Sequence, residues 1–191
     1  FEQEAAFRAL TFNSNGGYST AFMVNTPVVE NQLAFRFTGE YSSSDSYILN
    51  APNPVPAGFD PNEEKRLRLR GKVLYEPEGI DDLSLVFSVD YTDFQNPTEG
   101  FFNGNIDNLS ITPPFFLSNS YEDVEQIIYS ARLTYDFSDQ VALVARVSHL
   151  DNDLEFVGTG EVFSPFPGFS ITGNSTFFDK DLTEVEAYLQ F

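Results

Sequence analysis

The sequence predicts an all-β protein: an antiparallel transmembrane β-barrel of which about eight strands are present. Apolar and polar residues alternate with period two along several segments of strand length. From the second segment on, short and long connections alternate, as in barrels with periplasmic turns and extracellular loops; the first connection is an exception because it is early and brief. Basic residues fall on the polar strand faces, where they would line a lumen. We expect residues 1–191 to form one β-barrel segment with no plug domain.

The clearest predicted element is a β-hairpin over residues 65–95, with a bend at 77–82 that contains Pro and Gly. Its first arm alternates leucine, glycine and valine with four cations. These cations are Arg66, Arg68, Arg70 and Lys72. Each arm has about the 9–11 residues that a tilted transmembrane strand requires. A charge that faces lipid at mid-bilayer costs about 2–4 kcal/mol, so the cationic face must look away from lipid.

Six further strands follow from the same alternation. They span residues 4–12, 18–25, 33–42, 126–137, 141–150 and 183–191. Short connections are predicted at 13–17, 26–30, 77–82 and 138–139, and long linkers at 43–64, 96–125 and 151–181. Tyr and Phe near the strand ends would form aromatic girdles at the two membrane interfaces.

Composition excludes several other classes of protein. No run of about 18 apolar residues exists, which excludes a helical membrane protein. The absence of cysteine excludes a disulfide scaffold, a thiolate zinc site and a Cys nucleophile. A net charge of -19 argues against nucleic acid as a partner. A soluble all-β sandwich would show similar alternation, but it does not require two classes of connection or a row of cations.

The cations on the predicted strands are expected to face the lumen. They are Arg36, Arg66, Arg68, Arg70, Lys72, Arg132 and Arg146. Two roles are open for them: they pair with carboxylates of a plug or of the opposite wall, or they guide an anionic ligand. The structural role is the favoured one, and an anionic ligand is compatible with it.

Aromatic residues in the long linkers are the candidate ligand-binding residues, because clustered exposed aromatics mark binding surfaces. They are Phe101, Phe102, Phe115, Phe116, Phe163, Phe166 and Phe169, with Phe177 and Phe178 in the same linker as the last three. They would hold an apolar or aromatic ligand at the mouth of the barrel. The alternative is that the linkers fold over one another and use these rings as a small core.

No catalytic residue, resident metal or cofactor is expected, and the chain is interpreted as a non-enzyme. It lacks G-x-S-x-G, H-E-x-x-H and a phosphate-binding glycine loop. His149 is the single histidine and is expected in a girdle or at the base of a loop. Residues 151–155, DNDLE, have oxygen ligands at calcium-like spacing but lack the glycine of an EF-hand loop. They are interpreted as a solvated acidic loop base.

Two stretches resemble the early barrel of TonB-dependent outer-membrane receptors. The first is a turn beginning Asn25-Thr26-Pro27-Val28, followed by a strand that opens Leu33-Ala34-Phe35-Arg36. The second is RGKVLYEP at 70–77, which is similar to the family's R-G-K-L-x-W-x-P strand. The resemblance covers about residues 16–95, and the remaining strands fit by pattern only.

This resemblance implies a 22-stranded barrel closed by an N-terminal plug, of which the chain would be an early part. Such receptors lie in the outer membrane of Gram-negative bacteria. They take up scarce nutrients, such as iron in ferric siderophores, with energy from the TonB complex. The expected partners are therefore outer-membrane lipid, a plug domain, the TonB complex and a small-molecule ligand.

The alternative function is a complete small barrel of eight strands with a structural, adhesive or narrow-channel role. The last residue, Phe191, fits this alternative because it is similar to the C-terminal assembly signal of outer-membrane proteins.

Overall fold

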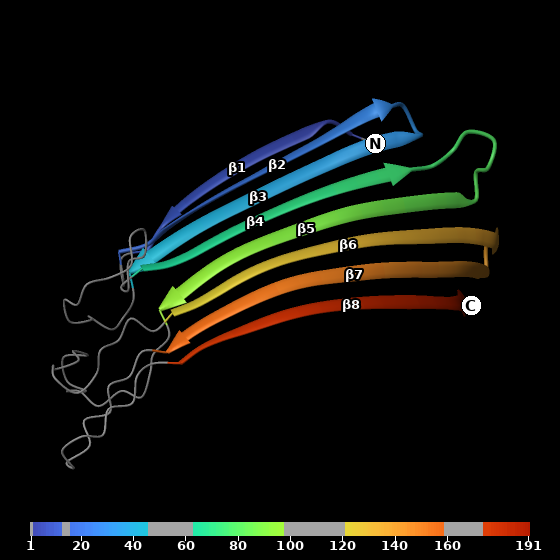
Figure 1. Ribbon diagram of the computed structural model, residues 1–191. Helices are drawn as coiled ribbons and strands as arrows, with labels where there is room; N and C mark the ends of the chain where they lie inside the picture. The colour runs from blue at the N-terminus through green and yellow to red at the C-terminus, as the bar shows by residue number, and fades with distance from the viewer. Residues whose placement is uncertain (1, 13–15, 46–62, 98–120, 159–173) are drawn as a thin grey trace, which may run out of the picture.

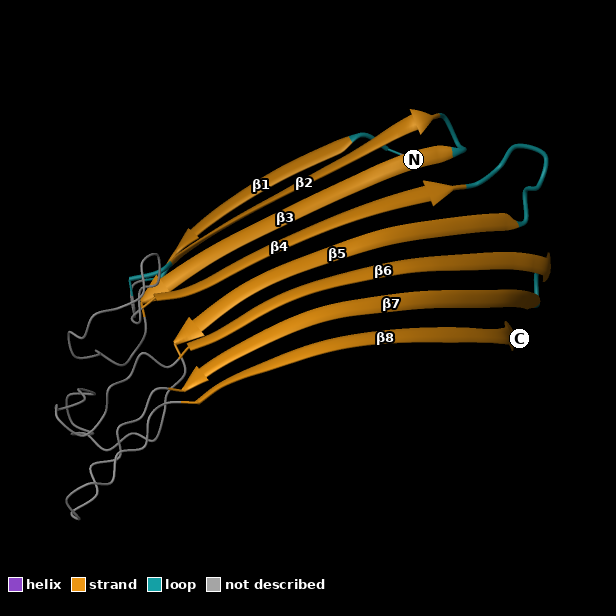
Figure 2. Ribbon diagram, in the orientation of Figure 1, coloured by secondary structure: helices purple, strands orange, loops and turns teal. Residues whose placement is uncertain are grey.

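The computed structural model is a single curved layer of antiparallel strands (Figure 1). It describes residues 2–12, 16–45, 63–97, 121–158 and 174–191. Figure 2 shows only strands and connecting turns in this part of the chain. The described residues contain no helix that is long and apolar enough to cross a membrane.

Eight strands follow one another in sequence order across the sheet. Their bounds are β1 Glu4–Thr11, β2 Tyr18–Val29, β3 Leu33–Asp45, β4 Glu63–Tyr75, β5 Leu83–Pro97, β6 Tyr121–Ser138, β7 Val141–Gly158 and β8 Asn174–Gln190. Every neighbouring pair is antiparallel. The all-β antiparallel part of the prediction is therefore confirmed.

The sheet is open, because β1 and β8 are its two edges in the described part of the chain. A complete small barrel would instead pair β1 with β8. Each edge strand leaves one row of backbone donors and acceptors without a strand partner. The eight strands thus form a curved wall and do not close upon themselves.

Short turns join β2 to β3, β4 to β5 and β6 to β7, and they lie at one end of the sheet (Figure 1). We call this the short-turn end, and the opposite end the linker end. In the β2–β3 turn Asn31 has a φ of 55°, in the left-handed region that asparagine tolerates. In the β4–β5 turn Gly79 has a φ of 85°. The predicted bend at 77–82 is confirmed.

One predicted connection is wrong, because residues 26–29 continue β2 and the turn comes at 30–32. The β2–β3 register shifts between Pro27 and Val29. Proline has no N–H to give to a ladder, and an irregular site near a strand end accommodates it.

Several strands reach further toward the linker end than their apolar alternation predicted. β6 begins at Tyr121, β7 continues to Gly158, and β8 begins at Asn174. The predicted linker boundaries at 96–125 and 151–181 are therefore wrong. The physical reason is that backbone pairing does not depend on apolar side chains, so a ladder continues through acidic residues once its register is set.

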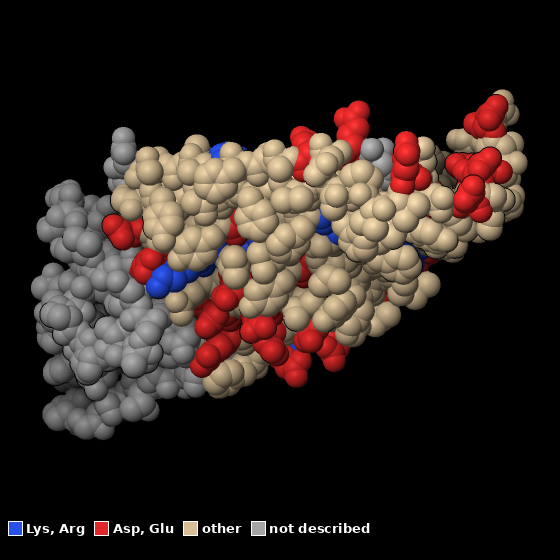
Figure 3. Space-filling model, turned by 90° about the horizontal axis from the view of Figure 1, so that it is seen from above, with Lys and Arg blue, Asp and Glu red and all other residues tan. Residues whose placement is uncertain are grey.

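The register gives the sheet two chemically different faces. On the apolar face, large side chains such as Phe7 and Val185 are 73% and 76% exposed. Among described residues, only Ala34 and Val144 are buried apolar side chains. The sheet therefore has no second layer over it. Figure 3 shows a broad uncharged surface along the molecule, with acidic side chains gathered toward its margins.

Aromatic packing on the apolar face depends on a glycine. Gly39 pairs directly with Phe22, and a Cβ at Gly39 would lie 2.3 Å from the Phe22 ring. The missing side chain lets this ring lie across β3, where its centroid is 5.5 Å from that of Phe37. Gly71 lies on the same face of β4 and has open space around it.

We expect Gly39→Ala to lower the free energy of unfolding by about 1–3 kcal/mol, the usual cost of overpacking. The added methyl group displaces the Phe22 ring from its contact with Phe37. Gly71→Ala is the matched control and should leave stability unchanged or slightly higher. Urea unfolding of the detergent-solubilised protein measures both. Equal losses in the two variants would contradict the packing role of Gly39.

Candidate binding face

The face opposite the apolar one carries the predicted cations, and we call it the charged face. Directly paired residues share a face, and side chains two residues apart along a strand do so too. Lys72 pairs with Arg36 on one side and Ser88 on the other, and Ser88 pairs with Ser130. The charged face therefore holds Arg36, Arg66, Arg68, Arg70, Lys72, Arg132 and Arg146.

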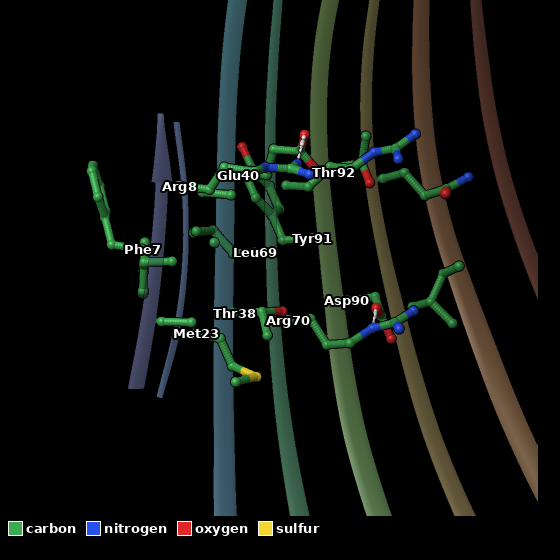
Figure 4. A pocket seen from close by; sticks show the side chains of 17 residues that line it. Phe7, Arg8, Met23, Thr38, Glu40, Leu69, Arg70, Asp90, Tyr91 and Thr92 are labelled. Carbon is green, nitrogen blue, oxygen red and sulfur yellow. Dashed lines mark hydrogen bonds and ion pairs between the residues drawn. The ribbon is translucent and has the colours of Figure 1, made fainter. Parts of the chain in front are cut away.

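Ion pairs on the charged face join neighbouring strands. Arg70 contacts Asp90, its direct partner on β5 (Figure 4). Arg146 Nη1 lies 3.8 Å from a carboxylate oxygen of Glu186, its direct partner on β8. These side chains are substantially exposed, so each pair contributes at most about 1 kcal/mol. Each pair neutralises a cation of one strand with a carboxylate of the next strand.

Two further cations on this face contact carboxylates that are not their direct partners in the ladder. Arg8 extends from β1 over the small side chain of Ala21 and approaches Glu40 on β3 at 3.6 Å. Arg66 lies 3.7 Å from Glu64 and 4.5 Å from the centre of the Phe94 ring, a cation–π distance.

Five cations on the charged face make no ion pair within the described residues. They are Arg36, Arg68, Lys72, Arg132 and, at the linker end, Lys180. Arg36 stands directly opposite Lys72 in the β3–β4 ladder, and Arg132 stands opposite Arg146 in the β6–β7 ladder. Like charges directly opposite each other destabilise a sheet. Arg36 and Lys72 share their row with Glu4 at one edge of the sheet and with Glu184 at the other.

A hollow of about 740 Å³ lies toward the β1–β5 side of the sheet (Figure 4). Charges of both signs line it, together with apolar side chains. The charged members are Arg8, Glu40, Arg68, Arg70 and Asp90. Its volume falls in the range of small-molecule sites, and it is open to solvent. The arrangement can hold a polar ligand by hydrogen bonds and ion pairs.

The candidate ligand-binding phenylalanines lie outside the described residues. They are Phe101, Phe102, Phe115, Phe116, Phe163, Phe166 and Phe169. Phe177 and Phe178, predicted in the same linker as the last three, instead belong to β8, where they are 69% and 56% exposed. That part of the linker prediction is wrong because β8 extends its pairing with β7 past the apolar band.

Rows of carboxylates at the linker end of the apolar face were missed by sequence reasoning. Asp93, Glu125, Asp153 and Asp179 are direct partners on four successive strands. The rows beside this one add further carboxylates, and together we call them the acidic rows. Their members are Asp93, Asp123, Glu125, Asp151, Asp153, Glu155, Asp179 and Asp181. The available signal was the alternation of acids within residues 123–125, 151–155 and 179–181.

The predicted acidic loop base at 151–155 is wrong, because these residues belong to β7. An extended strand cannot wrap an ion as a calcium loop does. Carboxylate oxygens of Asp151, Asp179 and Asp181 from two neighbouring strands do lie within 4.8 Å of one another, and all three residues are exposed. His149 lies inside β7, with Nδ1 2.9 Å from the Thr183 hydroxyl.

Two carboxyl groups beyond the apolar band have shifted pKa values of opposite sign. Hydrogen bonds from Lys65 and then Ser43 lower the pKa of Glu63. Desolvation raises the pKa of Asp123, with smaller contributions from the negative charges of Asp93, Glu155 and Glu125. At neutral pH the ionised form of Asp123 is thus disfavoured, first by its burial and then by the neighbouring carboxylates.

No protein-family model and no solved structure matches this chain. The decisive property of the candidate face is the contrast between an apolar surface and a cation-rich surface on the two sides of one sheet.

We expect Asp123→Asn to stabilise the protein at neutral pH and to have little effect at about pH 3. A carboxyl whose pKa is raised on folding favours the folded state below its ordinary value of 3.8, and this contribution is lost as pH rises through the folded pKa. The group is half-buried and solvent still screens its charge, so the gain should stay below about 1 kcal/mol. Urea unfolding at the two pH values measures it.

Asp139→Asn, in the β6–β7 turn, removes one carboxylate away from the acidic rows and is the control. A gain from Asp123→Asn that is as large at pH 3 as at pH 7 would show that charge is not its cause.

Proposed function

We propose that this chain is part of the wall of an outer-membrane β-barrel that works as a TonB-dependent nutrient receptor in a Gram-negative bacterium. One observation carries the proposal: a single sheet exposes large apolar side chains on one face and gathers cations on the other. An exposed apolar surface of this extent in water is unfavourable. The apolar face would pack against lipid, and the charged face would look into the barrel.

Aromatic pairs near both ends of the apolar face support a membrane placement. Tyr18 and Tyr41 lie toward the linker end with ring centroids 5.9 Å apart. Tyr135 and Phe137 lie near the short-turn end with centroids 5.0 Å apart. Aromatic girdles of this kind flank the lipid-facing band of outer-membrane barrels.

The open edges support a larger barrel than eight strands. Lipid cannot satisfy the unpaired backbone groups of β1 and β8, so other strands must cover both edges in a membrane. The resemblance of residues 16–95 to early strands of the receptor family agrees with a barrel of 22 strands. The alternative of eight strands that close alone would need a β1–β8 pairing, which the described residues do not make.

The proposed mechanism is capture and transport without covalent chemistry. Linker aromatics would hold the nutrient outside the cell, and the plug and the TonB complex would control its release inward. A ferric siderophore is a suitable ligand class, because many carry net negative charge and Arg36, Lys72 and Arg132 make no ion pair within the described residues.

We expect Val147→Arg to block membrane assembly, whereas Ser148→Arg should be tolerated. Val147 is 42% exposed on the apolar face, between Ala131 and Val185. Ser148 lies on the charged face between Ser130 and Glu184. Arginine facing mid-bilayer costs about 2–4 kcal/mol. The measurement is the amount of each variant in purified outer membranes.

If both variants reach the outer membrane equally, or if Val147→Arg increases the yield of a detergent-free monomer, the membrane proposal fails. The pair is matched because both changes add the same side chain at adjacent positions of β7.

Disruption of the gene in its source bacterium should abolish uptake of one ferric siderophore under iron limitation. Because TonB supplies the energy, dissipating the proton gradient should produce the same loss in the intact strain. Uptake of radiolabelled iron with a panel of siderophores measures the effect, and re-expression of the gene should restore it. Unchanged uptake across the panel would contradict iron-siderophore transport.

A further inference from the structure

We infer that the charged face carries an oxyanion site between Lys72 and Arg132, floored by Ser88 and Ser130, that binds a carboxylate or phosphate group. The inference deepens the proposed function and rests on it, since it names the chemistry recognised by the face that would line the barrel. The site lies toward the short-turn end of the charged face.

The register brings these four residues into two adjacent rows. Lys72, Ser88 and Ser130 are direct partners across β4, β5 and β6. Arg132 lies two residues beyond Ser130 on β6 and pairs with Val86. Strands about 4.8 Å apart and a rise of about 3.4 Å per residue place the Lys72 and Arg132 backbones about 12 Å apart. Two long side chains span that distance with room for one oxyanion.

The two serines provide a polar floor. Their hydroxyl oxygens are 2.7 Å apart, so one hydroxyl donates to the other. The accepting serine keeps its own hydroxyl proton available for an additional bond. Both residues are half-buried, which shields this proton partly from water.

The cations beside the two serines can bind an anion. Lys72 and Arg132 make no ion pair within the described part of the chain, and Arg36 stands directly opposite Lys72. Of the carboxylates on this face, Asp90 contacts Arg70 and Glu186 pairs with Arg146. Glu4 and Glu184 stand at the two ends of the row that contains Lys72 and the serines, and neither makes an ion pair within the described residues. A bound oxyanion would offset the repulsion between the opposed cations.

The donor set selects the class of ligand. An ammonium, a guanidinium and a hydroxyl offer hydrogen-bond donors, which match the acceptor-only oxygens of a carboxylate or phosphate group. Two sources of this chemistry fit the barrel interior: a free anionic ligand, or an acidic side chain of a segment that fills the lumen.

Phosphate titration of the detergent-solubilised 191-residue chain at constant ionic strength tests the site. We expect a saturable rise in Tm and saturable broadening of the phosphorus NMR signal. Lys72→Gln and Arg132→Gln should each weaken phosphate binding about tenfold, the loss of one charge-assisted hydrogen bond. Arg66→Gln is the matched control, because it removes one cation from the same face of β4 at the linker end.

A second measurement separates lost binding from lost folding. Without phosphate, Lys72→Gln should have a Tm equal to or above that of the wild type, because the change removes the repulsion with Arg36. The order of the two proteins should reverse at saturating phosphate. The site is overturned if phosphate has no saturable effect on the wild type, or if Lys72→Gln and Arg66→Gln respond alike.

Citrate and a glutamate-rich peptide, titrated at equal carboxylate concentration, distinguish the two sources. Tighter binding of citrate assigns the site to a free anion, and tighter binding of the peptide assigns it to a lumen-filling segment. Binding of neither contradicts a carboxylate site. The Val147→Arg and Ser148→Arg variants test membrane placement without phosphate. A chain that binds no phosphate can therefore still prove to be a barrel wall, and a chain that fails the membrane test can still prove to bind phosphate.

Discussion

The backbone ladder between consecutive strands is the constraint on which the whole structure depends. Because the side-chain period of a strand is two, one register assigns every residue to a face. A slip of one residue in β4 would move Arg70 onto the apolar face and Leu69 onto the charged face. No second layer covers the described sheet, so cross-strand contacts and the ladder itself take the place of a packed core.

The two faces also change along the strands. The apolar face is aliphatic and aromatic through its middle and becomes acidic at the linker end, where Asp93, Glu125, Asp153 and Asp179 are aligned. In the proposed barrel these acids would lie beyond the lipid-facing band, where a charge costs less than it does at mid-bilayer. Charge is therefore sorted by position along the strand as well as by face.

The charged face combines satisfied and unsatisfied cations. Arg70 is matched by Asp90 on the next strand, whereas Lys72, one position further along the same face, meets Arg36 and a serine. A wall that only needed solubility would have no reason to oppose like charges. Opposed cations are stabilised when an anion occupies the space above the sheet, as the proposed oxyanion would inside the proposed barrel.

The sequence by itself determined the strand class, the bend at 77–82 and the shared face of the β4 cations, because alternation and turn chemistry are local properties. Only the tertiary structure decided that Asp151–Glu155 and Phe177–Phe178 lie in strands, that the acids align in rows, and that the sheet remains open. These features depend on which residue of the neighbouring strand stands opposite. The register fixes which distant residues pair, and the alternation within one strand does not determine that register.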